Sequence, residues 1–255
     1  MFYTYRMDTV LITFSPTGGT YKCAKYLASG IGEIKAHIDL SDRSKSFDIE
    51  IDSNIMAIFA LPAYGGRIPK GSAERLKSIK GNNTDATIVA VYGNREIDDT
   101  LLEIYDIIKD NGFKVKAAVS AIAEHSLVRK YGAMRPDAID KEELRSFGER
   151  IASSNSYLET IPGNYPYKTF NGCPARPITD IDKCANCSLC FSKCPVEAIS
   201  ENDYSSIDDS LCISCMRCVS ICPMDAKDID ATIYNNIDSM LSKVASERKN
   251  NALYL

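Results

Sequence analysis

Eight of the ten cysteines in the chain form two copies of one spacing, C-x2-C-x2-C-x3-C followed by proline. Thiolate sulfur is a soft ligand that suits iron, and this run is a known signature of bacterial iron–sulfur ligation. The doubled spacing therefore predicts two 4Fe–4S clusters. The first copy is Cys184, Cys187, Cys190 and Cys194 before Pro195, and the second is Cys212, Cys215, Cys218 and Cys222 before Pro223.

The two runs are expected to share their ligands. Three cysteines at every third position can wrap a loop around three corners of a cubane, whereas the fourth lies too close along the chain to complete the same cluster easily. Where two such clusters occur, the fourth cysteine ligates the other one, which makes the clusters neighbours. One predicted cluster then takes Cys184, Cys187, Cys190 and Cys222, and the other takes Cys212, Cys215, Cys218 and Cys194.

Disulfide bonds and zinc are the alternative uses of these cysteines. Residues 1–7 are polar and aromatic, unlike a secretory signal, so a disulfide framework is not expected. Zinc sites usually pair two C-x2-C hooks across a longer gap. Iron–sulfur ligation is therefore favoured, and Cys23 and Cys173 are interpreted as core or incidental thiols.

Length and charge narrow the class of protein. The chain has 255 residues and no apolar run that approaches the ~20 residues of a membrane span, so a cytoplasmic protein is expected. Residues 173–255 hold 8 Lys and Arg against 12 Asp and Glu, and the rest of the chain holds 22 of each. This local acidity argues against nucleic acid and suggests a basic redox partner, although solubility alone would also explain it.

The first 160 residues alternate apolar runs with helical patterns. Continuous β-branched runs are typical of strands buried on both faces of a parallel sheet, and one alternating run is typical of an edge strand. Five such strands with intervening helices predict a doubly wound α/β sheet. The expected strands are 10–14, 34–39, 55–61, 87–92 and 115–122, and the expected helices are 21–30, 72–80, 98–111 and 137–158.

The loop after the first expected strand carries a second chemical signal. Small hydroxyl residues and glycines precede a helix there, and backbone N–H groups at a helix N-terminus bind anions. The loop lacks the glycine fingerprint of dinucleotide binders and the G-K-[ST] of P-loops. It resembles the loop with which flavodoxins hold the FMN phosphate. The matching residues are Ser15, Thr17, Gly18, Gly19 and Thr20.

Two further loops at the same sheet edge are candidates for flavin contact. In flavodoxins the first supplies an aromatic ring and a close backbone approach to the flavin. The chain has no tryptophan, which leaves a tyrosine for that role, and His125 at the end of the fifth strand is either a proton carrier or an ordinary loop residue. The candidates are Ala63, Tyr64, Gly65 and Gly66 in one loop and Tyr92, Gly93 and Asn94 in the other.

The remaining segments predict the domain division. Two prolines and a glycine within residues 161–167 indicate that residues 161–172 are a linker between a domain at 1–160 and the cluster domain at 173–230. Apolar residues recur at helical spacing from Ile229 to Val244. Residues 231–255 are therefore expected to form a helix that packs back on the protein, with partner binding as the alternative.

Together, the segments FSPTGGT and LPAYGGRIP and the doubled cysteine run resemble the flavodoxin–ferredoxin fusion proteins of anaerobic bacteria and archaea, and the resemblance covers nearly the whole chain. It implies a flavodoxin-like sheet of strand order 2-1-3-4-5, followed by a small α+β bacterial two-cluster ferredoxin domain. It also implies FMN and two 4Fe–4S clusters in internal electron transfer. It does not name a reaction.

Three functions follow as hypotheses. The first is an electron carrier between FMN, the clusters and an external redox partner, which is a protein or a small molecule. The second is a flavin-dependent reductase of a small acceptor, with Tyr64, Arg67, Arg95 and His125 around the substrate and the clusters as electron inlet. The third is a ferredoxin with a flavin-free docking domain. A flavin edge covered by the cluster domain would favour the carrier. The oligomeric state is left open, and a homodimer would join one chain's clusters to another's flavin.

Overall fold

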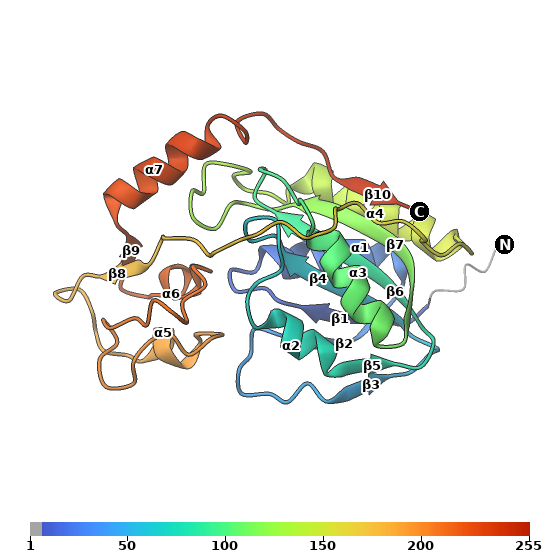
Figure 1. Cartoon of the computed structure of the whole chain (residues 1–255), viewed down its shortest axis with the longest axis horizontal. Coiled ribbons are helices and arrows are strands. Elements are labelled where there is room, and N and C mark those ends of the chain that lie inside the picture. Colours follow the sequence, from blue (N-terminus) through green and yellow to red (C-terminus); the bar gives the residue numbers. More distant parts are fainter. Residues whose placement is uncertain (1–6) are drawn as a thin grey trace.

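The main sheet has five parallel strands in the order β2-β1-β4-β6-β7, with the antiparallel strand β10 beside β7 (Figure 1). This computed structural model describes residues 7–255, so residues 1–6 of the expected first domain lie outside the described residues. The parallel strands confirm the predicted flavodoxin-like order 2-1-3-4-5. Their bounds are β1 Thr9–Thr13, β2 Ile34–Asp39, β4 Met56–Pro62, β6 Thr84–Tyr92 and β7 Phe113–Ile122, and β10 is Ala252–Tyr254.

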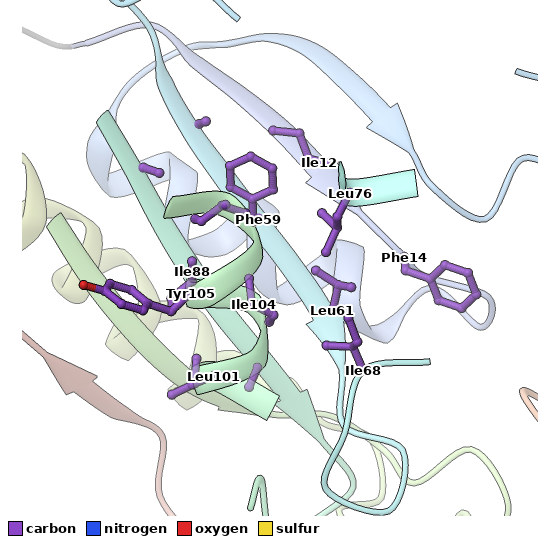
Figure 2. Close-up of a cluster of buried hydrophobic side chains, with 14 of the residues drawn as sticks. Ile12, Phe14, Phe59, Leu61, Ile68, Leu76, Ile88, Leu101, Ile104 and Tyr105 are labelled. Atoms are coloured by element: carbon purple, nitrogen blue, oxygen red, sulfur yellow. The ribbon is translucent and has the colours of Figure 1, made fainter. Parts of the chain in front are cut away.

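Helices cover both faces of this sheet, which explains the continuous apolar runs. Alternate side chains of a strand point to opposite faces, so Ile12 joins one buried cluster and Leu11 the other. Figure 2 shows the first cluster, in which Phe59 packs near residues of α3 such as Ile104. That face is covered by α2 (Ser72–Lys77) and α3 (Thr100–Asp110).

The opposite face carries α1 (Gly19–Ile31) and α4 (Ala138–Ser153), which pack closely against each other. The contact depends on two glycines without side chains. A Cβ on Gly30 would lie 1.9 Å from the carbonyl oxygen of Arg145, and one on Gly148 would lie 2.2 Å from that of Leu27. The two backbones can therefore approach each other only because both positions are glycine.

The sheet unit departs from the expected elements in several places: the helix expected at residues 137–158 ends at Ser153, and the strand expected at 87–92 begins at Thr84. The expected helix at residues 72–80 ends at Lys77, and the chain then forms β5 (Ile79–Gly81). This strand pairs in parallel with β3 (Ile49–Ile51), which the sequence pattern did not predict, as a separate two-stranded sheet.

The cysteine-rich segment forms a small unit built from two similar halves. Strands β8 (Pro177–Thr179) and β9 (Lys227–Ile229) pair antiparallel at its base. Between them lie the short helices α5 (Leu189–Ser192) and α6 (Arg217–Ser220), which contact each other. Figure 1 shows this unit beside the main sheet. It is the ferredoxin-type region.

The expected linker is held along the sheet unit. The carboxylate of Asp99 accepts the backbone N–H groups of Asn164 at 2.8 Å and Lys168 at 2.6 Å. The hydroxyls of Tyr165 and Tyr167 both donate to Asp106. These bonds fix the path of the segment from α4 to β8, which Figure 1 shows crossing the molecule.

The C-terminal segment contains a helix and then returns to the sheet. Helix α7 (Ala231–Leu241) packs on Val128 and Tyr131, whereas the end of the chain adds β10 to the sheet edge rather than continuing the helix expected to residue 255. Buried Asn251 locks this end, because its amide accepts from the N–H of Ile122 at 2.8 Å and donates to Asp140 at 2.9 Å. No helix in residues 7–255 is long and apolar enough to cross a membrane.

Candidate functional site

A cavity of about 470 Å³ lies at the carboxyl ends of the central strands, where open α/β sheets bind ligands. It has the size of a cofactor pocket. The predicted flavin loops provide one wall, and the linker, the ferredoxin-type region and α7 provide the other. Of the predicted residues, those lining it are Thr17, Gly19, Thr20, Ala63, Tyr64, Gly65, Tyr92, Gly93, Arg95 and His125.

The loop before α1 presents an anion site to this cavity. Helix α1 has Gly18 at its N-cap, which offers no side chain, and no acidic residue in its first turn, so no carboxylate neutralises the helix dipole on the cavity side. Ser15 does not line the cavity; its hydroxyl accepts the N–H of Tyr21 at 2.9 Å and supports the turn. Gly18 adopts φ of +90°, a conformation that favours glycine, and also lies off the cavity wall.

The loop after β4 forms a tight turn around Tyr64. The backbone groups of Tyr64 and Arg67 bond to each other at 2.8 and 3.2 Å, and Gly65 and Gly66 adopt positive φ between them. Burial, with a smaller effect from the charge of Cys215, raises the pKa of Tyr64 well above its usual value. Tyr64 is half-buried and borders the cavity, on the side where Ser214 of the second cysteine run also lies.

Two predicted residues are used elsewhere. The Arg67 guanidinium forms an ion pair with Glu103 at 2.8 Å and lies over the ring of Tyr167, so it faces the linker. Asn94 is buried and its amide donates to the carbonyl oxygens of Ala245 and Glu247 at 2.6 and 2.7 Å. It therefore ties the C-terminal segment to the sheet unit and does not line the cavity. Gly66, also predicted, does not line the cavity either.

His125 lines the cavity as a neutral side chain at pH 7. Burial and the nearby charge of Arg95 lower its pKa to about 4. Its Nδ1 atom accepts the backbone N–H groups of Leu127 and Val128 at 3.3 and 3.2 Å, which leaves the proton on Nε2. A Cβ on Gly93 would lie 2.5 Å from this ring, so glycine is required beside it. The geometry suits a fixed hydrogen-bond donor better than a proton carrier.

The opposite wall of the cavity was not foreseen from the sequence. Phe170 of the linker lies against the backbone of Gly65, where a Cβ would meet its ring at 2.2 Å. Cys173 follows it, and Ile213 and Ser214 come from the loop between two predicted cluster ligands. Ile237 and Leu241 of α7 complete the cover. Neither the linker nor the C-terminal segment has a local sequence pattern that would predict its position beside the cavity.

The eight motif cysteines gather around two small cavities in the crossed arrangement. Each cavity is bordered by three cysteines of one run and the fourth cysteine of the other. No three His, Cys, Asp or Glu side chains among residues 7–255 converge as a single metal ion would need, whereas a cubane keeps its ligands farther apart. One cavity has Cys184, Cys187, Cys190 and Cys222, and the other has Cys194, Cys212, Cys215 and Cys218.

The two cysteine sets differ in burial. Cys187 of the first set is exposed, whereas Cys194 and Cys215 of the second are buried. Burial raises the pKa of the Cys215 and Cys218 thiols to about 12, so their thiolate form needs nearby positive charge such as iron. Each set has one sulfur that accepts a backbone N–H group. The acceptor is Cys222 Sγ in the first set, at 3.3 Å, and Cys194 Sγ in the second, at 3.4 Å.

Comparison with known proteins identifies the cysteine-rich region. Residues 183–227 match the family model described as a 4Fe-4S dicluster domain. Among solved structures, a flavodoxin from the domain Archaea is 13% identical, with 57% of this chain and 96% of that chain covered and a TM-score of 0.38. For the Streptococcus pneumonia TIGR4 flavodoxin these values are 18%, 57%, 97% and 0.38. For the Trp repressor binding protein from Bacillus subtilis they are 17%, 58%, 99% and 0.37. No curated protein matches the chain.

TM-scores this low do not identify the fold. The flavodoxin-like assignment of the sheet rests on its strand order. The chain therefore joins a flavodoxin-like α/β unit to a ferredoxin-type iron–sulfur region. Iron–sulfur regions of this kind act in electron transfer.

Proposed function

We propose that the chain is an electron carrier that binds FMN in the 470 Å³ cavity and two 4Fe–4S clusters in the ferredoxin-type region. The observation that carries the proposal is the wall shared by the two units. Ile213 and Ser214 border the flavin cavity, and their neighbours Cys212 and Cys215 border a cysteine cavity. Flavin accepts or donates two electrons and each cluster one, so the pair links two-electron and one-electron chemistry.

The residues around the cavity fit FMN. Thr17 and Thr20 lie at the uncapped start of α1, where a phosphate is favoured. Tyr64, Tyr92 and Phe170 supply aromatic surface for the flavin rings. No described residue bonds the hydroxyls of Thr17 or Thr20, so both are free to donate to a ligand. His125 offers its Nε2–H to the same space.

The arrangement gives the carriers an order. The second cysteine set (Cys194, Cys212, Cys215 and Cys218) adjoins the flavin cavity through Ile213 and Ser214, and the first set contributes no residue to that wall. Crossed ligation keeps the two clusters adjacent. We therefore place the buried cluster between FMN and the cluster that includes Cys187, which lies at the surface.

The outer cluster is proposed to meet the external partner. Ile181 and Met224 are exposed near it, and Asp180, Asp182 and Asp225 add negative charge. A partner with basic residues around a small apolar centre would complement this surface.

Electron exchange with such a partner should slow as salt rises from 0.05 to 0.5 M, since screening weakens the attraction. A rate that is independent of salt would contradict a charged docking surface. Stopped-flow spectroscopy would measure it.

The covered cavity favours a carrier over a reductase. A reductase needs an open approach for a small substrate to the flavin. Here Phe170, Cys173 and α7 cover part of the side of the cavity opposite the sheet. Of the residues considered for substrate binding, Tyr64, Arg95 and His125 line the cavity, whereas Arg67 pairs with Glu103 and faces the linker.

Replacing the two threonines tests the flavin site. Thr17→Val with Thr20→Val should weaken FMN binding by about 10-fold or more, because hydrogen bonds to a charged group contribute ~1.5–3 kcal/mol each. Quenching of flavin fluorescence on binding to flavin-depleted protein would give the Kd. Thr87→Val is the matched control, since Thr87 is a buried threonine of β6 whose hydroxyl contacts only Met56 Sδ at 3.7 Å. Equal FMN affinity in both variants would contradict the proposed site.

A further inference from the structure

Lys227 is a buried cation in the ferredoxin-type region, with 4% of its surface exposed. Its ammonium group donates to the hydroxyl of Thr179 at 2.7 Å and to the carbonyl oxygen of Tyr204 at 2.6 Å, both of which are neutral. Within residues 7–255 it forms no ion pair with a carboxylate. The neighbouring cations behave differently, since Lys183 pairs with Asp180 and Arg176 with Asp209.

The position of Lys227 relates it to both cysteine sets. It borders the cavity of Cys184, Cys187, Cys190 and Cys222. The carbonyl oxygen that it holds belongs to Tyr204, which packs in one hydrophobic cluster with Cys190 of the first set and Cys218 of the second. Strand β9, which pairs Lys227 with Thr179 of β8, holds it in that place.

A buried ammonium is costly without a nearby negative charge. Among the carboxylates, Asp203 feels the charge of Lys227 only weakly and bonds to Ser205 instead. A 4Fe–4S cluster with four thiolate ligands is net negative, and each added electron makes it more so. The compensating charge for Lys227 is therefore expected to come from the clusters.

Resting on the proposed function, we propose that Lys227 is a counter-ion shared by the two clusters, and that it raises the reduction potential of both. A fixed positive charge favours the reduced, more negative form of each cluster. The potential of an iron–sulfur centre responds to the charge around it in this way. Lys227 is thus a residue that tunes potentials and not a ligand.

The test compares Lys227→Met and Lys227→Gln with Lys227→Arg in anaerobically prepared full-length protein. Redox titration followed by electron paramagnetic resonance gives the potential of each cluster. In the neutral variants both potentials should fall by at least a tenfold shift of each one-electron equilibrium, about 59 mV. The Arg variant should retain most of the wild-type values. Lys183→Met, which removes an exposed cation close in sequence to Cys184, is the control and should shift them little.

The outcomes separate this inference from the proposed function. A fall confined to one cluster would overturn the shared role, and unchanged potentials in both neutral variants would overturn the inference entirely. Gln can keep a hydrogen bond to Thr179, so it guards against loss of folding in the Met variant. If the wild-type protein itself holds fewer than two clusters, the proposed function fails first.

Discussion

Cys215→Ala should stop electron transfer between the flavin and the clusters, whereas Cys187→Ala should impair only the transfer from the outer cluster to an external acceptor. Each change deletes one ligand of a different predicted cluster, so each variant should lose about four of the eight iron atoms expected for two 4Fe–4S clusters. In Cys215→Ala the flavin loses its neighbouring cluster, and exchange between the flavin and the remaining iron should collapse. In Cys187→Ala that exchange should persist, while reduction of an external acceptor slows.

Light-driven reduction of the flavin, followed by absorbance of the clusters, measures the internal step. Cys173→Ala is the matched control, because this thiol borders the proposed flavin cavity and belongs to neither cysteine set. It should leave the iron content unchanged. An identical defect in Cys187→Ala and Cys215→Ala would contradict the proposed order of the clusters, and full iron content in both would contradict the ligand assignment.

Asp140→Asn should destabilise the whole sheet unit. Asp140 and Arg135 form an ion pair with both side chains almost fully buried, and Asn251 of the C-terminal segment donates to the same carboxylate. Removing one charge of a buried pair leaves the other uncompensated, which costs about 3–5 kcal/mol. For a chain of this size the Tm should fall by roughly 10 °C. Circular dichroism during heating would measure it.

The matched control is Glu142→Gln on the same helix. Its ion pair with Arg145 is exposed, and such pairs contribute less than ~1 kcal/mol. Burial would raise the pKa of Asp140, but hydrogen bonds from Arg135, Asp137 and Asn251 outweigh it and hold the pKa at about 2. Its stabilising effect is therefore complete above pH 3.8, the ordinary value, and is lost as the pH falls to about 2. Equal Tm values for the two variants would show that the pair is dispensable.

The sheet could be predicted from sequence because its signal is local. Strands buried on both faces must be apolar at every position, and Leu11 and Ile12 satisfy this by facing opposite clusters. The cysteine spacing is a local signal of the same kind. The two runs border two cavities in the crossed grouping, and the assignment of these cysteines as cluster ligands stays a prediction.

The cover of the 470 Å³ cavity could not be predicted, because it depends on segments far apart in sequence. Phe170 stands in a linker whose neighbours indicate only irregular structure, yet it packs on Gly65. Asn94 sits where a flavin contact was expected, but its amide bonds to the tail at Ala245. The three residues of β10 are too short a pattern to reveal pairing with β7. Each of these contacts depends on the packing of the linker or the C-terminal segment against the sheet unit, which no local pattern specifies.

The most direct test of the central claim is the cofactor content of the full-length protein purified without oxygen. Iron, acid-labile sulfide and flavin would be counted together with the absorption spectrum. One FMN and about eight iron atoms per chain are expected. Iron without flavin would contradict the central claim and leave a ferredoxin with a docking domain. Flavin with about four iron atoms or fewer would contradict the two-cluster assignment.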